Sequence, residues 1–97
     1  MVLIFEWDDG KSKKNQRKHR IGFEEAKTVF IDLLLITFPD EYHSENEQRL
    51  ISIGASNQNR ILLVVHTEIL ESSDTVIVRI ISARKATASE RRVYEES

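Results

Sequence analysis

The sequence predicts an α+β fold in which helices pack on one antiparallel sheet, with the element order β-α-α-β-β-β-β-α. Three observations support it: strand-like runs cluster in the second half, apolar residues recur at helical spacing near the N-terminus, and a capping signal precedes a last helix. The chain has 97 residues, which suits one small domain, and we expect residues 1–97 to form that domain.

The N-terminal part predicts a strand and two helices. Residues 3–7 are aromatic and branched, which favours a strand, and Asp8 is suited to cap the helix that follows. Residues 9–19 contain no apolar stripe and predict a polar helix. A second helix is predicted by apolar residues at helical spacing, namely Phe23, Ala26 and Phe30.

The rest of the chain predicts four strands and a final helix. The apolar run over residues 33–38 ends at Pro39 and predicts a strand, although periodicity alone also allows the preceding helix to continue into it. Residues 40–47 predict a polar loop. Turn-rich segments then separate three strand-like runs, which predict an antiparallel meander over residues 48–54, 60–69 and 75–82. Residues 87–90 (Thr-Ala-Ser-Glu) have capping-box spacing, so a helix should follow.

Composition excludes several classes of protein. The chain has 14 basic and 16 acidic side chains, which excludes a histone-like tail that binds through overall charge. It has no cysteine, which excludes a disulfide scaffold, a thiol nucleophile and a cysteine-ligated metal. No apolar run approaches the roughly 20 residues that span a bilayer, and no basic region precedes the short apolar start. We therefore expect a soluble cytoplasmic protein without a membrane partner.

The charge is unevenly distributed along the chain. Residues 1–22 carry six basic and three acidic side chains, residues 23–59 carry two and seven, and residues 60–97 carry six of each. A local patch that binds phosphate is therefore compatible with a slightly acidic chain. A solvated helix face is the alternative explanation of the lysine-rich segment.

Arg79 is unusual because it interrupts an apolar strand. Alternation places its side chain opposite those of Val78 and Ile80. A charge at such a position must be paired or in contact with water. Two interpretations stay open: Arg79 opens into a groove, or it pairs with a carboxylate such as Glu47.

The remaining candidates for chemistry are cationic. The histidines His19, His43 and His66 lack metal-ligand spacing, so no metal site is indicated. Cationic side chains gather late in the chain, at Arg60, Arg79, Arg84, Lys85, Arg91 and Arg92. Arginine binds phosphate oxygens and stabilises transition-state charge, and Tyr94 could stack on a base or donate a proton. These residue types suit RNA cleavage without a metal, although any surface helix can also carry arginines.

Motifs along nearly the whole chain resemble those of one protein family. In the first half they are Phe5-Glu6-Trp7-Asp8, Lys11, Asn15, Lys18-His19, Phe23-Glu24-Glu25-Ala26, Val29-Phe30 and Asp32. Further motifs are Asp40, His43-Ser44-Glu45, Glu47, Arg49, Ile53-Gly54, Ser56 and Arg60, then residues 79–87, Glu90-Arg91 and Tyr94-Glu95. The chain resembles the BrnT toxin family in these motifs. It departs from the family pattern at Arg20 and Gly22, where Gly and Ser are more frequent, and at His66, where an aromatic residue is frequent. Its loop over residues 67–74 is also expanded.

This resemblance implies the toxin half of a bacterial type II toxin–antitoxin pair, with a RelE-like fold. It implies a metal-independent endoribonuclease that arrests translation and growth and needs no cofactor. It also implies a ribbon-helix-helix antitoxin, which blocks the toxin and brings it to operator DNA.

For RelE-like enzymes the resemblance implies attack by the ribose 2′-hydroxyl on the adjacent phosphate. Arg79 and Arg84 are then expected to bind the phosphate, with Lys85 as base or second cation. Arg60 would orient the phosphate, and Tyr94 would stack on or protonate the substrate. Further RNA contacts are expected from Arg49, Arg91, Lys18 and His19. We expect the guanidinium groups to converge on one spot.

Some alternatives stay open. Glu90 is expected to be the capping partner of Thr87 rather than a base. His19 and His43 are either general bases or structural residues that satisfy backbone groups. The alternative function is a non-catalytic binding module that acts in a complex with a DNA-binding partner, because groups that bind phosphate for catalysis would also bind it passively.

Overall fold

The computed structural model describes residues 1–43 and 47–97; Ser44 and Glu45, which belong to the resemblance, lie outside the described residues. The elements are β1 (Val2–Glu6), α1 (Asp9–His19), α2 (Phe23–Ala26), the 3-10 helix η1 (Lys27–Ile31), β2 (Ile36–Pro39), β3 (Leu50–Ala55), β4 (Ile61–Leu70), β5 (Thr75–Lys85) and α3 (Ala88–Glu95). Their order matches the prediction. The predicted strand over residues 33–38 is wrong in its first half, because residues 33–35 form a turn after η1 in which Asp32 accepts from Leu34 N–H.

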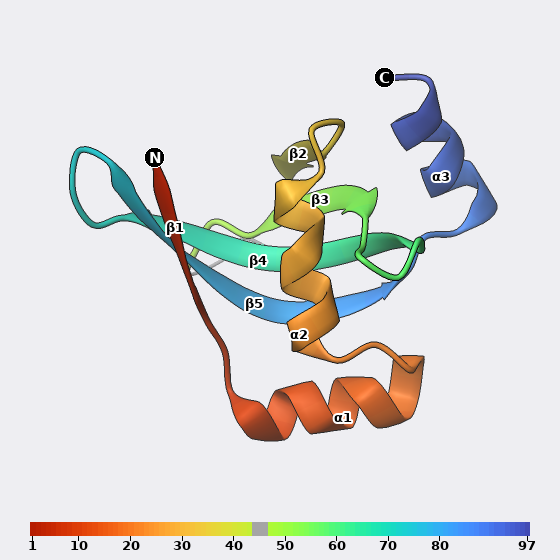
Figure 1. Cartoon of the computed structure of the whole chain (residues 1–97), viewed down its shortest axis with the longest axis horizontal. Coiled ribbons are helices and arrows are strands. Elements are labelled where there is room, and N and C mark those ends of the chain that lie inside the picture. Colours follow the sequence, from red (N-terminus) through yellow and green to blue (C-terminus); the bar gives the residue numbers. More distant parts are fainter. Residues whose placement is uncertain (44–46) are drawn as a thin grey trace.

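The sheet is mixed rather than antiparallel. Its five strands lie in the order β1-β5-β4-β3-β2, and Figure 1 shows β1 beside β5. The predicted meander of β3, β4 and β5 is confirmed as antiparallel, and β2 pairs with β3 in the same sense. The prediction of an antiparallel sheet fails at β1, which runs parallel to β5. These two strands are far apart in sequence, so no hairpin turn dictates their relative direction.

One face of the sheet packs against the helical layer. Figure 1 shows α2 crossing this face. The buried core consists of Ile21, Phe23, Ala26, Val29, Leu62, Val64, Ile80 and Ala83. We call the opposite face the pocket face; the pairings Ile51–Val65, Val65–Ser82 and Leu63–Arg84 place those residues on it. No helix in the described part of the chain is long and apolar enough to cross a membrane.

A β-bulge in β5 decides which side chains reach the pocket face. Val65 pairs with Ser82 and His66 pairs with Ile80, so Ile81 is an extra residue without a partner in β4. Strict alternation from the buried Ile80 would turn Arg84 toward the helices. The bulge reverses the alternation, and Arg84 therefore lies on the pocket face.

A buried histidine lies among polar groups on the helical face. The side chain of His66 is completely buried, and its Nε2 lies 2.7 Å from Ser52 Oγ, which is itself 2.7 Å from Thr37 Oγ1. The ring of Phe30 packs edge-on against it, at 4.9 Å between centroids. Burial lowers the pKa of His66 from 6.5 to about 4, although Glu68 Oε1 lies 3.8 Å from Nδ1. His66 is therefore neutral in the folded protein at neutral pH.

This pKa predicts a loss of stability in acid. The unfolded chain takes up a proton at this residue below pH 6.5, whereas the folded chain does so only near pH 4. The free energy of unfolding should therefore fall by about 3 kcal/mol across that range on account of His66. His66→Phe should remove this part of the loss, as measured by urea denaturation at pH 7, 5.5 and 4. An equal loss in the wild type and the variant would contradict the prediction, and His19→Ala, which removes a histidine whose ring forms no hydrogen bond with any described residue, is the control.

Candidate functional site

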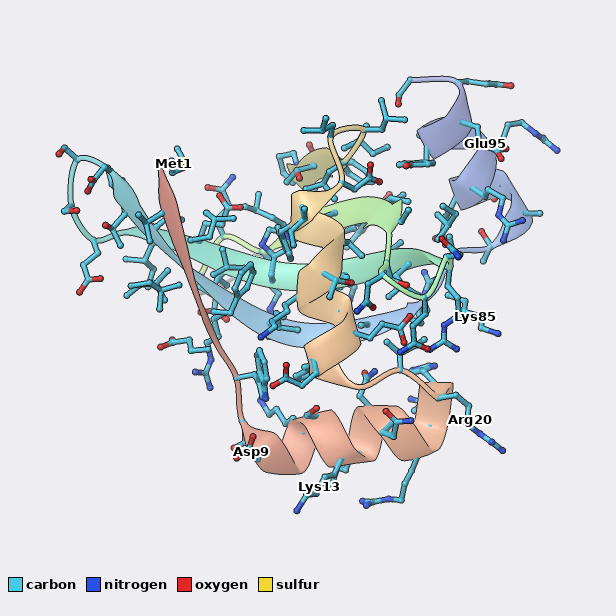
Figure 2. All side chains as sticks on the ribbon, in the orientation of Figure 1. Met1, Asp9, Lys13, Arg20, Lys85 and Glu95 are labelled. Atoms are coloured by element: carbon cyan, nitrogen blue, oxygen red, sulfur yellow. The ribbon has the colours of Figure 1, made fainter. Side chains whose placement is uncertain are left out.

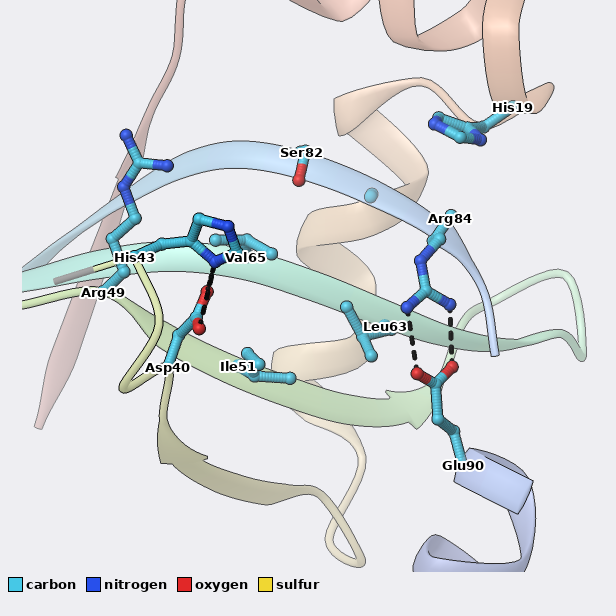
Figure 3. Close-up of a pocket in the computed structure, with 11 residues that line it drawn as sticks. His19, Asp40, His43, Arg49, Ile51, Leu63, Val65, Ser82, Arg84 and Glu90 are labelled. Carbon is cyan, nitrogen blue, oxygen red and sulfur yellow. Dashed lines mark hydrogen bonds and ion pairs between the residues drawn. The ribbon is translucent and has the colours of Figure 1, made fainter. Parts of the chain in front are cut away.

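A pocket of about 430 Å³ lies on the pocket face. Its floor is formed by β3, β4 and β5, and its rim by the end of α1, the segment between β2 and β3, and the start of α3 (Figure 3). The floor residues are Ile51, Leu63, Val65, Ser82 and Ala83, and the rim residues are His19, Asp40, His43, Arg49, Arg84 and Glu90. The pocket thus combines an aliphatic floor with a rim of charged groups and imidazoles.

A buried asparagine fixes α1 against β5. Asn15 Nδ2 donates to the backbone oxygens of Ala83 and Ile21, both at 2.7 Å, and Asn15 Oδ1 accepts from Ala83 N–H at 3.2 Å. Helix α1 begins with an N-cap bond from Lys11 N–H to Asp8, as predicted for Asp8. His19 follows Asn15 by four residues and therefore lies on the same side of the helix. The asparagine thus places His19 at the rim.

The guanidinium of Arg84 is held rigidly by Glu90. Arg84 Nη1 and Nη2 donate to the two carboxylate oxygens of Glu90, at 2.7 and 2.9 Å. Glu90 also completes a capping box with Thr87, as predicted. The pair lowers the pKa of Glu90 to about 2 and raises the pKa of Arg84. Glu90 is consequently ionised over the whole physiological pH range.

This pairing leaves one edge of Arg84 available. Glu90 binds the end of the guanidinium, and Lys85 O accepts a further bond from Nη1 at 3.3 Å. Among the described residues, none accepts a bond from Nε. A guanidinium can bind a second oxyanion along the edge formed by Nε and Nη2. Arg84 is therefore pre-oriented to bind an anion while its pair with Glu90 stays intact.

On the other side of the pocket, Asp40 holds His43. The Nδ1 atom of His43 lies 3.0 and 3.2 Å from the two Asp40 carboxylate oxygens. The Asp40 side chain is 8% exposed and that of His43 is 68% exposed. Asp40 N–H donates to Arg49 O at 2.8 Å, and Arg49 Nε lies 3.7 Å from Glu47 Oε1. The carboxylate is thus anchored where β2 meets β3, and the imidazole is open to solvent.

The expected convergence of the guanidinium groups is wrong. Arg60 forms a two-point ion pair with Glu25, which also accepts from Ser56 Oγ, and this holds the pKa of Glu25 below its ordinary value. Arg79 lies 3.4 Å from Glu6, its partner in the parallel register. The interpretation that Arg79 pairs with a carboxylate is therefore confirmed, although the partner is Glu6 rather than Glu47. Neither arginine lines the pocket.

The other predicted residues divide between the pocket and the rest of the surface. Arg49 and His19 line the pocket, whereas Lys18, Lys85 and Arg91 are exposed and do not. Figure 2 shows Lys85 at the end of β5. The Tyr94 hydroxyl donates to Asp32 at 2.5 Å, which raises the pKa of Tyr94 to about 12 and ties α3 to the end of η1. Tyr94 thus has a structural contact outside the pocket.

Sequence reasoning missed the role of Asp40 and Ser82 as pocket residues. Asp40 and His43 stand three residues apart just after Pro39, the spacing at which one turn brings two side chains together. That spacing was the available signal. The sequence contains no comparable signal for Ser82, because the bulge in β5 decides that its side chain lies on the pocket face. Within residues 1–43 and 47–97, no three histidine or carboxylate side chains gather closely enough to hold a metal ion.

Comparison with known proteins assigns the chain to a family. Residues 7–90 match the family described as "Ribonuclease toxin, BrnT, of type II toxin-antitoxin system". The chain belongs to the BrnT family. The fold is similar to the crystal structure of the Brucella abortus ribonuclease toxin BrnT, with 25% sequence identity, a TM-score of 0.63, and coverage of 90% of this chain and 99% of that chain. A search of curated proteins found no match. As a BrnT protein, this chain is a ribonuclease toxin of a type II toxin–antitoxin system.

Replacing Asn15 tests whether this residue holds the site together. Asn15→Ala leaves the backbone N–H and C=O of Ala83 and the C=O of Ile21 without these partners. We expect the free energy of unfolding to fall by roughly 2–5 kcal/mol, measured by chemical denaturation. Gln16→Ala, on the exposed part of the same helix, is the matched control. A loss below about 0.5 kcal/mol for Asn15→Ala, as is usual for surface substitutions, would contradict this role.

Proposed function

We propose that this BrnT protein is a metal-independent endoribonuclease with a RelE-like fold, which cleaves RNA in the cytoplasm to arrest translation and growth. The observation that carries the proposal is Arg84, whose guanidinium is fixed by Glu90 and keeps an open edge at the pocket rim. Membership of a ribonuclease toxin family supports the same activity.

The pocket residues suit a transesterification on RNA. The ribose 2′-hydroxyl attacks the adjacent phosphate, and negative charge builds on the phosphate oxygens in the transition state. Arg84 binds these oxygens through its Nε edge, and Arg49 supplies a second positive charge from the opposite rim. These cations take the electrostatic role that a divalent metal ion has in other nucleases.

The floor of the pocket suits a single nucleotide. Ile51, Leu63 and Val65 present an aliphatic surface between the two charged rims. A ribose or an unstacked base can rest on such a surface, and the volume of about 430 Å³ is that of a small-ligand site. RNA would therefore enter as an unpaired strand rather than as a duplex.

The activity test is cleavage of single-stranded RNA by the purified protein in EDTA. We expect fragments with a 2′,3′-cyclic phosphate and a 5′-hydroxyl. Arg84→Ala should lower kcat/KM by about 10²–10³, the usual cost of removing a transition-state donor. Lys13→Ala removes an exposed cation of α1 (Figure 2) and should cleave like the wild type. Cleavage that requires added divalent cation, or an unchanged rate for Arg84→Ala, would refute the proposal.

We further propose that the partner is a ribbon-helix-helix antitoxin. The toxin reaches operator DNA only through this antitoxin. Large apolar side chains are exposed on β1 and at the end of β4, as expected of a surface that a partner covers. They are Val2, Leu3, Ile4, Ile69 and Leu70. Family membership supports an antitoxin of some type.

Co-expression with the protein of the neighbouring gene tests this partner. We expect a ribbon-helix-helix protein to co-purify, to suppress RNA cleavage, and to shift operator DNA in a gel whether or not the toxin is present. The toxin alone should shift none. Operator binding by the isolated toxin, or a neighbouring protein that neither binds nor inhibits it, would contradict the proposal.

A second candidate function is a non-catalytic binding module that acts in the complex. The observation that favours it is the pairing of Arg60 and Arg79 with their own carboxylates, which leaves fewer cations for chemistry. Both functions include RNA binding, but only the nuclease yields cyclic-phosphate ends, so the EDTA assay distinguishes them.

A further inference from the structure

Two histidines stand on opposite sides of the pocket. Figure 3 shows His43 beside Asp40 and Arg49 on one rim, and His19 near Arg84 on the other, with Ser82 on the strand between them. The two histidines come from different parts of the chain, the segment after β2 and the last turn of α1. A phosphodiester bound at Arg84 would have one imidazole on each side.

We propose that His43, positioned by Asp40, is the general base of the cleavage reaction and that His19 is the general acid. This assignment rests on the proposed ribonuclease function and names the proton-transfer groups of the same pocket. It gives each histidine a role that follows from its own contacts.

The contact with Asp40 prepares His43 to accept a proton. An ionised carboxylate accepts only, so Nδ1 of the ring is the donor in this pair. In the neutral ring the other nitrogen, Nε2, then carries the lone pair. The buried Asp40 fixes the tautomer and orientation of the ring, while the exposed part of the imidazole stays accessible to substrate. Asp40 is therefore a positioning residue for His43.

The location of His19 prepares it to donate a proton. It is the last residue of α1 and lines the pocket near Arg84, where a protonated imidazole can donate to a leaving oxygen. Asn15 anchors this helix to Ala83, the neighbour of Arg84 in β5. In the described part of the chain, no residue forms a hydrogen bond with the His19 ring, so both ring nitrogens are available to a leaving group.

The two imidazole rings account for both proton transfers of the reaction. Nε2 of His43 takes the proton of the 2′-hydroxyl as the bond from O2′ to phosphorus forms. The bond from phosphorus to O5′ breaks, and O5′ takes a proton from protonated His19. The products are a 2′,3′-cyclic phosphate and a 5′-hydroxyl, and exchange with water restores the starting protonation of both histidines.

The two roles can be separated with a modified substrate. We use a short single-stranded RNA in two forms, one natural and one with sulfur in place of the bridging 5′-oxygen. A thiolate leaves without protonation, so the modified RNA does not need a general acid. His43→Ala should cleave both RNAs at least ~10²-fold more slowly than the wild type. His19→Ala should lose ~10²-fold on natural RNA but stay within a few-fold of the wild type on the modified RNA.

Asp40→Asn tests the positioning role. The neutral amide can hold Nδ1 in the wrong tautomer, so kcat on both RNAs should fall while KM and the melting temperature stay near their wild-type values. A fall in melting temperature that accounts for the lost activity would show a structural role instead and overturn this part of the proposal. Asp74→Asn, in the exposed turn between β4 and β5, is the matched control.

The outcomes distinguish this proposal from the proposed function. Wild-type activity in EDTA with unchanged rates for His43→Ala and His19→Ala would overturn the acid–base assignment and leave the ribonuclease function standing. Failure of the modified RNA to rescue His19→Ala would overturn the role of His19. No cleavage by the wild type would overturn both. The melting temperature of each variant shows whether a loss of activity reflects unfolding. His43→Gln and His19→Gln keep a polar side chain of similar size at each position, so they should lose activity while their melting temperatures stay near that of the wild type.

Discussion

The hydrogen bonds between the Asn15 side chain and the backbone of Ala83 are the contact on which the site depends. Strand β1 pairs with β5 only as far as Arg79, so the outer edge of β5 lacks a neighbouring strand at Ala83. The amide of Asn15 takes the place of that strand, because it donates to the carbonyl and accepts from the N–H of the same residue. The helix that carries His19 is thereby joined to the strand that carries Arg84.

The bulge at Ile81 and the asparagine contact act together. The bulge turns Ala83 toward the core and Arg84 toward the pocket face. Asn15 then fixes the backbone at Ala83, and Glu90 fixes the guanidinium of the next residue, Arg84. The bulge and these two contacts together determine the position of one cation.

Much of the fold could be predicted from local sequence signals. The capping box at Thr87, the N-cap at Asp8 and the antiparallel meander depend on neighbouring residues, and all are present in the structure. The parallel pairing of β1 could not be predicted from local signals, because it joins Val2–Glu6 to Thr75–Arg79, about 70 residues away in sequence. Nor could the conformation of Arg20 be predicted: it has a left-handed backbone with φ of 63° at the end of α1, a conformation that favours glycine.

The site was less predictable than the fold. The sequence predicts a site built from cationic residues, but it does not reveal their partners, because these lie far away in sequence, as for Arg60 with Glu25 and Arg79 with Glu6. Simple alternation along β5 also assigns Arg84 to the wrong face of the sheet, because the bulge at Ile81 shifts the alternation of side chains after Ile80.

The central claim is that RNA binds on the pocket face, between His43 and Arg84. Methyl NMR during titration with an RNA strand methylated at the 2′-oxygens, which cannot be cleaved, tests it most directly. We expect the largest shifts at the methyl groups of Ile51, Leu63 and Val65, with small changes at Val2 and Ile69. Shifts concentrated at β1 and the end of β4, with the floor methyl groups unchanged, would contradict it.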